Sequence, residues 1–338
     1  MVNSMPLKGH RIYLKSRSSY FTKPTNILCI VDNITLTALE FPKILARLER
    51  FTSTALGRSL AGTLTPSTDI TFIEDSYKEL RELEALLMAD LRLELAGLVD
   101  IQGFMARLRP AGSFLPREDL LALRETLKVF KVLQGLLSSD DFSLKFPITA
   151  KKIKSISDST NLCDELSRVF DNAGFIKDDA SYELMDIRRS LNDGRSACRK
   201  LVENIARTKL DALSSGDRQA DDDGDEGLFT IRDDRFVLSV KVGRHQDFPG
   251  VLHGRSRTGN TYFIEPIKAV EINNRIAMLK REEAAEEIEI LKALSRSFVE
   301  CGDILVLDTD VVAKLDLLQA KVLFGKELSA STALSINI

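Results

Sequence analysis

The side chains best suited to chemistry in this sequence are cations that lie close together between residues 232 and 257. Eight basic residues or histidines fall in this stretch, against only three acids. The eight are Arg232, Arg235, Lys241, Arg244, His245, His253, Arg255 and Arg257. A local group of cations with few competing acids can bind phosphates, although the whole chain carries a formal charge of −3. The same group could be a solubilising surface, and charge alone does not decide between these interpretations.

Aromatic side chains that could stack on nucleic-acid bases are scarce in this stretch. Phe236, Tyr262 and Phe263 are expected to serve the local core instead. Contact with a nucleic acid would therefore follow the shape of the backbone and not the identity of the bases.

No pattern in the sequence predicts a catalytic centre, a cofactor or a metal. The phosphate-binding motif G-x-x-x-x-G-K-[ST] does not occur, and its nearest fragment, FGKE at 324–327, lacks the first glycine and the hydroxyl residue. His245, His253 and Asp247 make an incomplete ligand set, because no cysteine accompanies them. No nucleophile motif surrounds Ser239 or Ser256. The four cysteines are far apart and form no CxxC pair.

Two long helices are predicted on either side of the cationic stretch. The first, over 181–213, has a seam of residues at steps of three and four, which are Leu184, Ile187, Leu191, Gly194, Cys198, Leu201 and Ile205. The second, over 266–302, repeats every seven residues at Ala277, Ala284, Leu291 and Phe298, with Ile288 between them. Gly302-Asp303 is expected to end it, before a final helix over 309–324. We expect the two long helices to pair in antiparallel fashion.

The spacing of apolar residues changes between these two helices, from a helical period to that of β-strands. An acidic stretch over 214–227 predicts a solvated loop. Four short strands are then predicted at 228–232, 235–242, 250–254 and 260–264, and Asp233-Asp234 joins the first two at hairpin spacing. Pro266 is expected to open the returning helix.

The predicted fold class is therefore mainly α: a helical core with a long antiparallel helix pair, the levers, that carries a small four-stranded β clamp. The core is expected over 34–180, with Asp69 as the N-cap of a helix near 70–89, and 303–338 returns to it. Residues 1–33 form a basic extension that is predicted to be disordered. No apolar run approaches the ~20 residues needed to cross a membrane, so no membrane partner is expected. A cytoplasmic location follows, or a plastid one if residues 1–33 are a transit peptide.

Several sequence motifs resemble the type-two branch of the MutS family. The clamp strands match it at 231–241 (IRDDRFVLSVK), 249–256 (PGVLHGRS), 256–266 (SRTGNTYFIEP) and 270–274 (VEINN). The opening helices match it at 39–41 (LEF), 54–58 (TALGR), 64–68 (LTPST) and 100–101 (DI). The resemblance covers roughly residues 36–324, in the order of the family.

This resemblance implies a DNA-binding core, lever and clamp region that works as a homodimer on duplex or branched DNA. It also implies an ATPase domain, which binds ATP and magnesium, and a small nuclease domain. Both are expected after residue 338, so neither activity is assigned to this chain. The acidic stretch over 214–227 departs from the family and would repel phosphates. Two alternatives remain open: a scaffold for dimerisation or ribosome docking, and a truncated gene product without activity.

Overall fold

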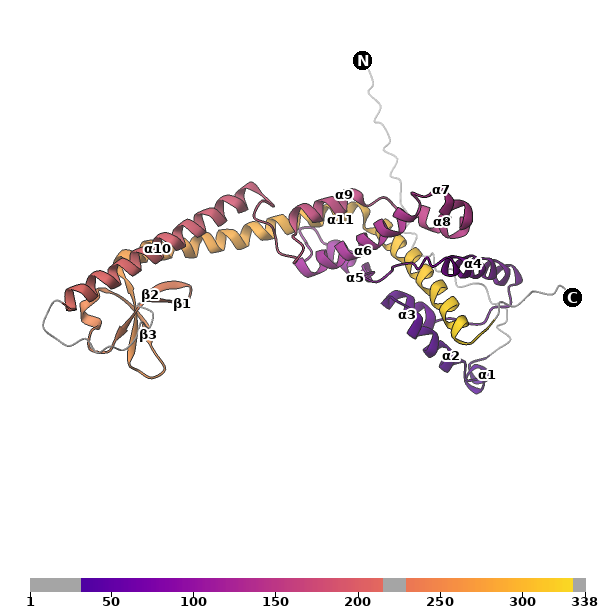
Figure 1. The fold of residues 1–338 in the computed structure, drawn as a ribbon, viewed down its shortest axis with the longest axis horizontal. Helices are drawn as coiled ribbons and strands as arrows, with labels where there is room; N and C mark the ends of the chain where they lie inside the picture. The colour runs from indigo at the N-terminus through magenta and orange to yellow at the C-terminus, as the bar shows by residue number, and fades with distance from the viewer. Residues whose placement is uncertain (1–31, 215–228, 331–338) are drawn as a thin grey trace, which may run out of the picture.

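The computed structural model describes residues 32–214 and 229–330, so the expectations for the basic extension up to residue 31 and for the loop over 215–228 lie outside it. The described residues form a helical body and a long helix pair that carries a small sheet at its far end (Figure 1). The body helices are α1 (Asn33–Ala38), α2 (Phe41–Leu48), α3 (Ala55–Gly62), α4 (Ile70–Met88), α5 (Gln102–Leu108), α6 (Arg117–Leu136), α7 (Asp140–Lys145), α8 (Pro147–Lys154) and α9 (Thr160–Val169), with a short 3₁₀ turn, η1, at Glu49–Phe51.

Local capping and apolar burial explain the body. The Asp69 carboxylate accepts a hydrogen bond from the Phe72 amide at 3.2 Å, which confirms the predicted N-cap of α4. Leu83 of α4, Phe130 of α6 and Phe298 of a later helix are all buried in one apolar cluster. Burial of this cluster supplies most of the free energy that holds the short helices together.

The helix pair consists of α10 (Tyr182–Ser214) and α11 (Ile267–Glu327), and α11 continues well beyond the pair. Its first part lies along α10, and its yellow C-terminal part turns toward α2 and α3 in Figure 1. The predicted break at Gly302-Asp303 is wrong, because α11 is one helix of 61 residues. Gly302 is a packing position, since a methyl group there would lie 2.8 Å from Sδ of Met105 in α5. Tertiary packing thus outweighs the weak helix propensity of glycine.

Buried polar side chains fasten the C-terminal part of α11 to the body. The Asp316 carboxylate accepts hydrogen bonds from the Thr54 amide at 2.8 Å and the Thr54 hydroxyl at 2.6 Å, at the start of α3. Gly57 leaves room for that carboxylate, since a methyl group there would overlap Oδ2 of Asp316. Gln319 pairs with both the amide and the carbonyl of Leu93. The motif at 54–58 therefore serves packing against α11.

The sheet at the far end is four-stranded and antiparallel, in the order β1-β2-β4-β3. Its strands are β1 (Phe229–Arg232), β2 (Arg235–Lys241), β3 (Gly250–Arg255) and β4 (Thr261–Pro266), with a 3₁₀ turn, η2, at His245–Asp247. We call these strands and their connections the β module. Asp233 and Asp234 both have positive φ, of 45° and 63°, as a two-residue hairpin turn requires. The mainly helical fold class with a four-stranded sheet is thereby confirmed.

One face of the sheet packs on the helix pair. Phe236, Leu238 and Val240 of β2 share a buried cluster with Cys198 of α10 and Ile276 of α11. Every second residue of β2 thus faces the helix pair, although Val237 is fully buried too. Pro266 stands at the N-cap of α11, where its missing amide proton removes no helical hydrogen bond.

The predicted seams are correct for α10 and partly wrong for α11. Leu184, Leu191 and Cys198 of α10 are buried as expected. On α11, Leu291 and Phe298 are buried, but Ala284 and Ile288 are exposed. Ile276, Leu279, Ile290 and Leu294 are the buried residues that pack there instead. The seven-residue register fails because acidic side chains occupy the middle of the helix pair, as described below.

Candidate nucleic-acid interface

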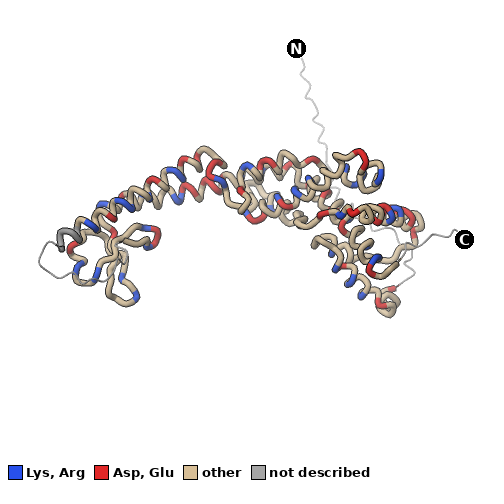
Figure 2. Tube along the Cα trace, in the orientation of Figure 1, with Lys and Arg blue, Asp and Glu red and all other residues tan. Residues whose placement is uncertain are grey.

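Five of the predicted cations gather at one end of the β module. Lys241 ends β2 and pairs with Thr261, while Arg255 ends β3 and pairs with Tyr262, so both side chains lie at the same end of the sheet. The connection between β2 and β3 and the turn between β3 and β4 bring further cations to this end. We call the five exposed residues Lys241, Arg244, His245, Arg255 and Arg257 the cation cluster. Figure 2 shows Lys and Arg positions over the loops of the module and acidic positions at its β1–β2 turn.

Tyr262 contacts two members of the cation cluster, Arg255 and His245. Its ring is buried in the module's apolar cluster, as expected for a core residue. The Arg255 guanidinium carbon lies 4.4 Å from the ring centroid, and this guanidinium also donates a hydrogen bond to the Tyr262 hydroxyl. The His245 ring lies 4.9 Å from the same centroid. These contacts fix the direction of Arg255 and His245, which reduces the side-chain entropy lost when they bind an anion.

Among residues 32–214 and 229–330, one acid accompanies the cation cluster. Asp247 lies in the turn that follows His245 and is exposed. In this described part of the chain, four arginine and lysine side chains therefore stand against a single carboxylate at this end of the module. Such a surface attracts polyanions through their phosphates.

Arg232 lies apart from the cluster. It ends β1 and pairs with Arg235 at the start of β2, six residues from Lys241, or about 20 Å along an extended strand. Its guanidinium carbon lies 4.9 Å from the Phe263 ring centroid. The neighbouring Asp234 forms an ion pair of 2.5 Å with Lys280 of α11, and this lowers the pKa of Asp234. Arg232 therefore belongs to the opposite end of the sheet.

Arg235 and His253 point toward a buried acid instead of solvent. Nη1 of Arg235 lies 2.8 Å from Oε1 of Glu265, and Nε2 of His253 lies 2.6 Å from Oε2. The Glu265 side chain is only 2% exposed. Burial alone would raise the pKa of the Glu265 carboxyl, but hydrogen bonds from Asn273, His253 and Arg235 outweigh it and hold that pKa below its ordinary value. The charge of Arg235 is thus already balanced within the molecule.

Asn273 of α11 ties this acid to the sheet. Its amide donates to Glu265 at 2.8 Å and to the Phe236 carbonyl at 3.2 Å, and its carbonyl accepts from the Phe236 amide at 3.1 Å. The Cys198 thiol of α10 also donates to this carbonyl, at 3.4 Å, and burial raises the pKa of that thiol to about 11. Asn274 accepts from Nη2 of Arg235 at 2.8 Å. We call Arg235, His253, Glu265, Asn273 and Asn274 the junction network.

Three members of the junction network, Glu265, Asn273 and Asn274, were not predicted individually from the sequence. All three lie in the motifs at 256–266 and 270–274, and an acid directly before a helix followed by a pair of asparagines was the available signal. The structure explains those motifs as the attachment of the sheet to α11.

Other chemistry is sparse in the part of the chain that the structure describes. Among residues 32–214 and 229–330, no group of three or more His, Cys, Asp or Glu side chains is arranged to hold a metal ion. None of the helices in those ranges combines the length and the apolar character that a membrane span requires.

Comparison with known proteins places the chain beside one group of bacterial proteins. No protein-family model matches it. It is 30% identical over 295 residues to Endonuclease MutS2 of Clostridium novyi, which covers 87% of this chain and 36% of that protein. It is 31% identical over 291 residues to Endonuclease MutS2 of Symbiobacterium thermophilum, covering 86% of this chain and 35% of that protein. It is 30% identical over 302 residues to Endonuclease MutS2 of Finegoldia magna, covering 89% of this chain and 37% of that protein.

The chain spans little more than a third of the length of these curated relatives. The match nevertheless covers most of its own described helices and strands, in agreement with the motifs at the sheet and in the opening helices. The chain is therefore a MutS2-like region, related over nearly nine tenths of its length to one part of the MutS2 endonucleases.

Proposed function

We propose that the cation cluster binds the sugar–phosphate backbone of DNA without reading its bases, and that α10 and α11 act as levers that carry this clamp. The single observation that carries the proposal is the gathering of Lys241, Arg244, His245, Arg255 and Arg257 at one end of a sheet, where Asp247 is the one acid among the residues that the structure describes. The relation to proteins named endonucleases supports nucleic acid as the polyanion, because an endonuclease acts on nucleic acid.

Three features favour backbone contact over base recognition. Tyr262 and Phe236 are buried in the module's own cluster and do not stack on external rings. Arg232 covers Phe263, the remaining aromatic of β4. The cluster then consists of exposed cations, which interact with phosphates through charge and give affinity that depends strongly on salt.

The test is removal of the cluster charge in the variant Lys241→Ala, Arg244→Ala, Arg255→Ala, Arg257→Ala. We expect weaker binding to duplex and branched DNA and a flatter salt dependence. The slope of log K against log salt should fall in magnitude by about 0.9 for each phosphate that the variant no longer neutralises, hence by up to about 3.6. Fluorescence anisotropy at several salt concentrations measures both quantities.

A matched control removes four other cations. Arg58, Arg92, Lys151 and Lys154 are exposed on the helical body, and the structure shows no ion pair for them. Their replacement by Ala changes the net charge equally but should leave most of the affinity and the slope. Equal losses in both variants would mean diffuse attraction and would contradict the proposal. Structured RNA in parallel titrations tests whether DNA is the preferred polyanion.

The remaining functional assignments also belong to this proposal. We propose that these 338 residues hold no catalytic centre, and that ATP and magnesium act in a part of the relatives that this chain does not match. We also propose that the chain forms a homodimer around DNA. The scaffold alternative receives less support, because Leu191 and Leu201, which would form an external docking seam, pack within the chain against the module's cluster.

A further inference from the structure

The middle of the helix pair is rich in charged side chains on both helices, and its one apolar contact in the module's cluster is the partly buried Ile187. We call residues 185–190 of α10 and 280–289 of α11 the polar section, and none of these residues is buried. On the side of the body, Leu184 and Ile290 belong to the main apolar cluster. On the side of the β module, Leu191 and Leu279 belong to the module's cluster. The two apolar cores are thus separated by about 15 Å of α11 that carries no buried side chain.

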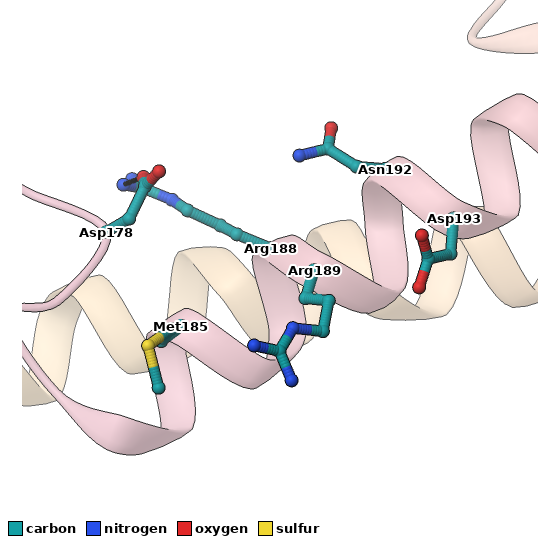
Figure 3. A pocket seen from close by; sticks show the side chains of 6 residues that line it. All are labelled: Asp178, Met185, Arg188, Arg189, Asn192 and Asp193. Atoms are coloured by element: carbon teal, nitrogen blue, oxygen red, sulfur yellow. Dashed lines mark hydrogen bonds and ion pairs between the residues drawn. The ribbon is translucent and has the colours of Figure 1, made fainter.

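A single arginine connects the elements across the polar section. Nε of Arg188 lies 2.8 Å from Glu283 and Nη2 lies 2.8 Å from Glu287, so this residue of α10 joins two successive turns of α11. Nη1 donates to Asp178 at 2.5 Å and to the Ile176 carbonyl at 2.9 Å, both in the segment before α10. Figure 3 shows the Arg188 side chain extended toward Asp178.

Among the described residues, Arg188 is the cation that pairs with Glu283 and Glu287 of the polar section. Glu283 and Glu287 lie four residues apart on one helix face, where like charges repel each other. Glu286 of the same turn accepts a hydrogen bond from the Ser181 hydroxyl at 2.8 Å, so its charge faces α10 as well. The Arg188 guanidinium is the group that makes these acids attract α10 rather than repel it.

The surroundings leave room for movement. Asp178, Met185, Arg188, Arg189, Asn192 and Asp193 line an open hollow beside α10 (Figure 3). Ion pairs that are partly exposed stabilise a contact weakly and are screened by salt, whereas the two apolar clusters resist separation through their buried area. The polar section is therefore the weakest part of the connection between body and module.

We propose that the polar section is a hinge at which the β module and its end of the helix pair pivot relative to the body, and that Arg188 is the latch that holds this hinge in one position. The proposal does not depend on what the cation cluster binds. It assigns to Arg188 a positioning role: the direction in which the β module faces is set by one guanidinium and three carboxylates.

The test measures distances between the body and the module. Spin labels at Leu144→Cys in α7 and Val251→Cys in β3, both exposed, are placed in a chain with Cys29 and Cys301 replaced by Ser. Double electron–electron resonance should give a narrow distance distribution for the chain with native Arg188 and a clearly broader one for Arg188→Met. Amide exchange in residues 185–190 and 280–289 should become faster by on the order of tenfold, while exchange in β2 and β4 stays unchanged.

The matched control is Arg189→Met. This neighbour loses the same charge from the same helix turn, but the structure shows no ion pair for it. Its distribution should stay as narrow as that of the native chain. If Arg188→Met leaves the distribution narrow, or if Arg189→Met broadens it equally, the latch is refuted.

A third variant distinguishes loss of the latch from misfolding, because it also removes Arg188 but should not broaden the distance distribution. Arg188→Leu with Glu283→Leu and Glu287→Leu replaces the ionic contact by apolar side chains and would join the two clusters into one seam. Its distribution should be as narrow as that of the native chain, although Arg188 is absent. A distribution as broad as that of Arg188→Met, with helix content intact by circular dichroism, would overturn the hinge.

Discussion

The junction network and the polar section use the same kinds of groups in different surroundings. At the junction, the buried Glu265 is the centre, and cations and amides converge on it inside the module's apolar cluster. At the polar section, Arg188, whose side chain is 20% exposed, is the centre, and three acids converge on it between two apolar clusters. The first joins the sheet to α11, and the second joins α10 to α11.

The difference in burial determines what each group of ions does. A buried, fully paired carboxylate that loses a partner leaves an unsatisfied charge, so the whole arrangement is stable only in one geometry. A partly exposed guanidinium that loses a partner gains water instead, so its alternatives differ little in free energy. The buried junction network therefore fixes the β module on α11. The more exposed ion pairs of Arg188 permit movement further along α11, at the polar section.

The largest expected effect comes from Asn273→Leu. This change keeps the volume but removes four hydrogen bonds and leaves the buried Phe236 amide and the Glu265 carboxylate short of partners. We expect a loss of about 3 kcal/mol in the free energy of unfolding, measured by urea denaturation. Amide exchange in β2 and β4 should increase together with it. Asn274→Ala serves as the control, since Asn274 is exposed and accepts a hydrogen bond from Arg235, and a loss as large as that of Asn273→Leu would contradict the role of burial.

The next effect is a pH dependence at the junction. Because the pKa of Glu265 lies below its ordinary value of 4.5, its ionised form contributes stability that is complete above that value. The contribution is lost as pH falls through the lowered pKa of the folded state. Unfolding of the native chain should therefore become easier below about pH 4, with a steeper slope than in Glu265→Gln. Identical slopes in urea titrations between about pH 3 and about pH 6 would show that Glu265 is not held in its charged form.

Local patterns made much of the fold predictable. The two-residue spacing at Asp233-Asp234 specified a hairpin, and the seven-residue spacing of Leu184, Leu191 and Cys198 specified the face of α10. These signals act over a few residues, so the sequence contains them fully. The continuity of α11 was not predictable, because Gly302 is explained by its contact with Met105 in a distant helix.

The site was predictable in composition but not in orientation. The cation cluster was predictable because the high density of basic residues between 232 and 257 can be read from the sequence. That count could not separate Arg255, which is exposed on Tyr262, from Arg235, which is neutralised by Glu265 in another strand. Strand pairing decides this difference, and the register of β2 against β4 is a property of the folded sheet.

The smallest expected effect concerns the register of α11. The seven-residue repeat predicted that Ile288 would lie in the seam. The Ile288 side chain is instead 40% exposed, beside the glutamates of the polar section. Ile288→Ala should therefore change the free energy of unfolding by less than about 0.5 kcal/mol. Leu279→Ala, in the module's cluster and only 4% exposed, should cost about 2 to 4 kcal/mol. If urea denaturation gave similar losses for both, α11 would present the heptad face to α10, and the polar section would be an apolar contact instead of a break between two cores.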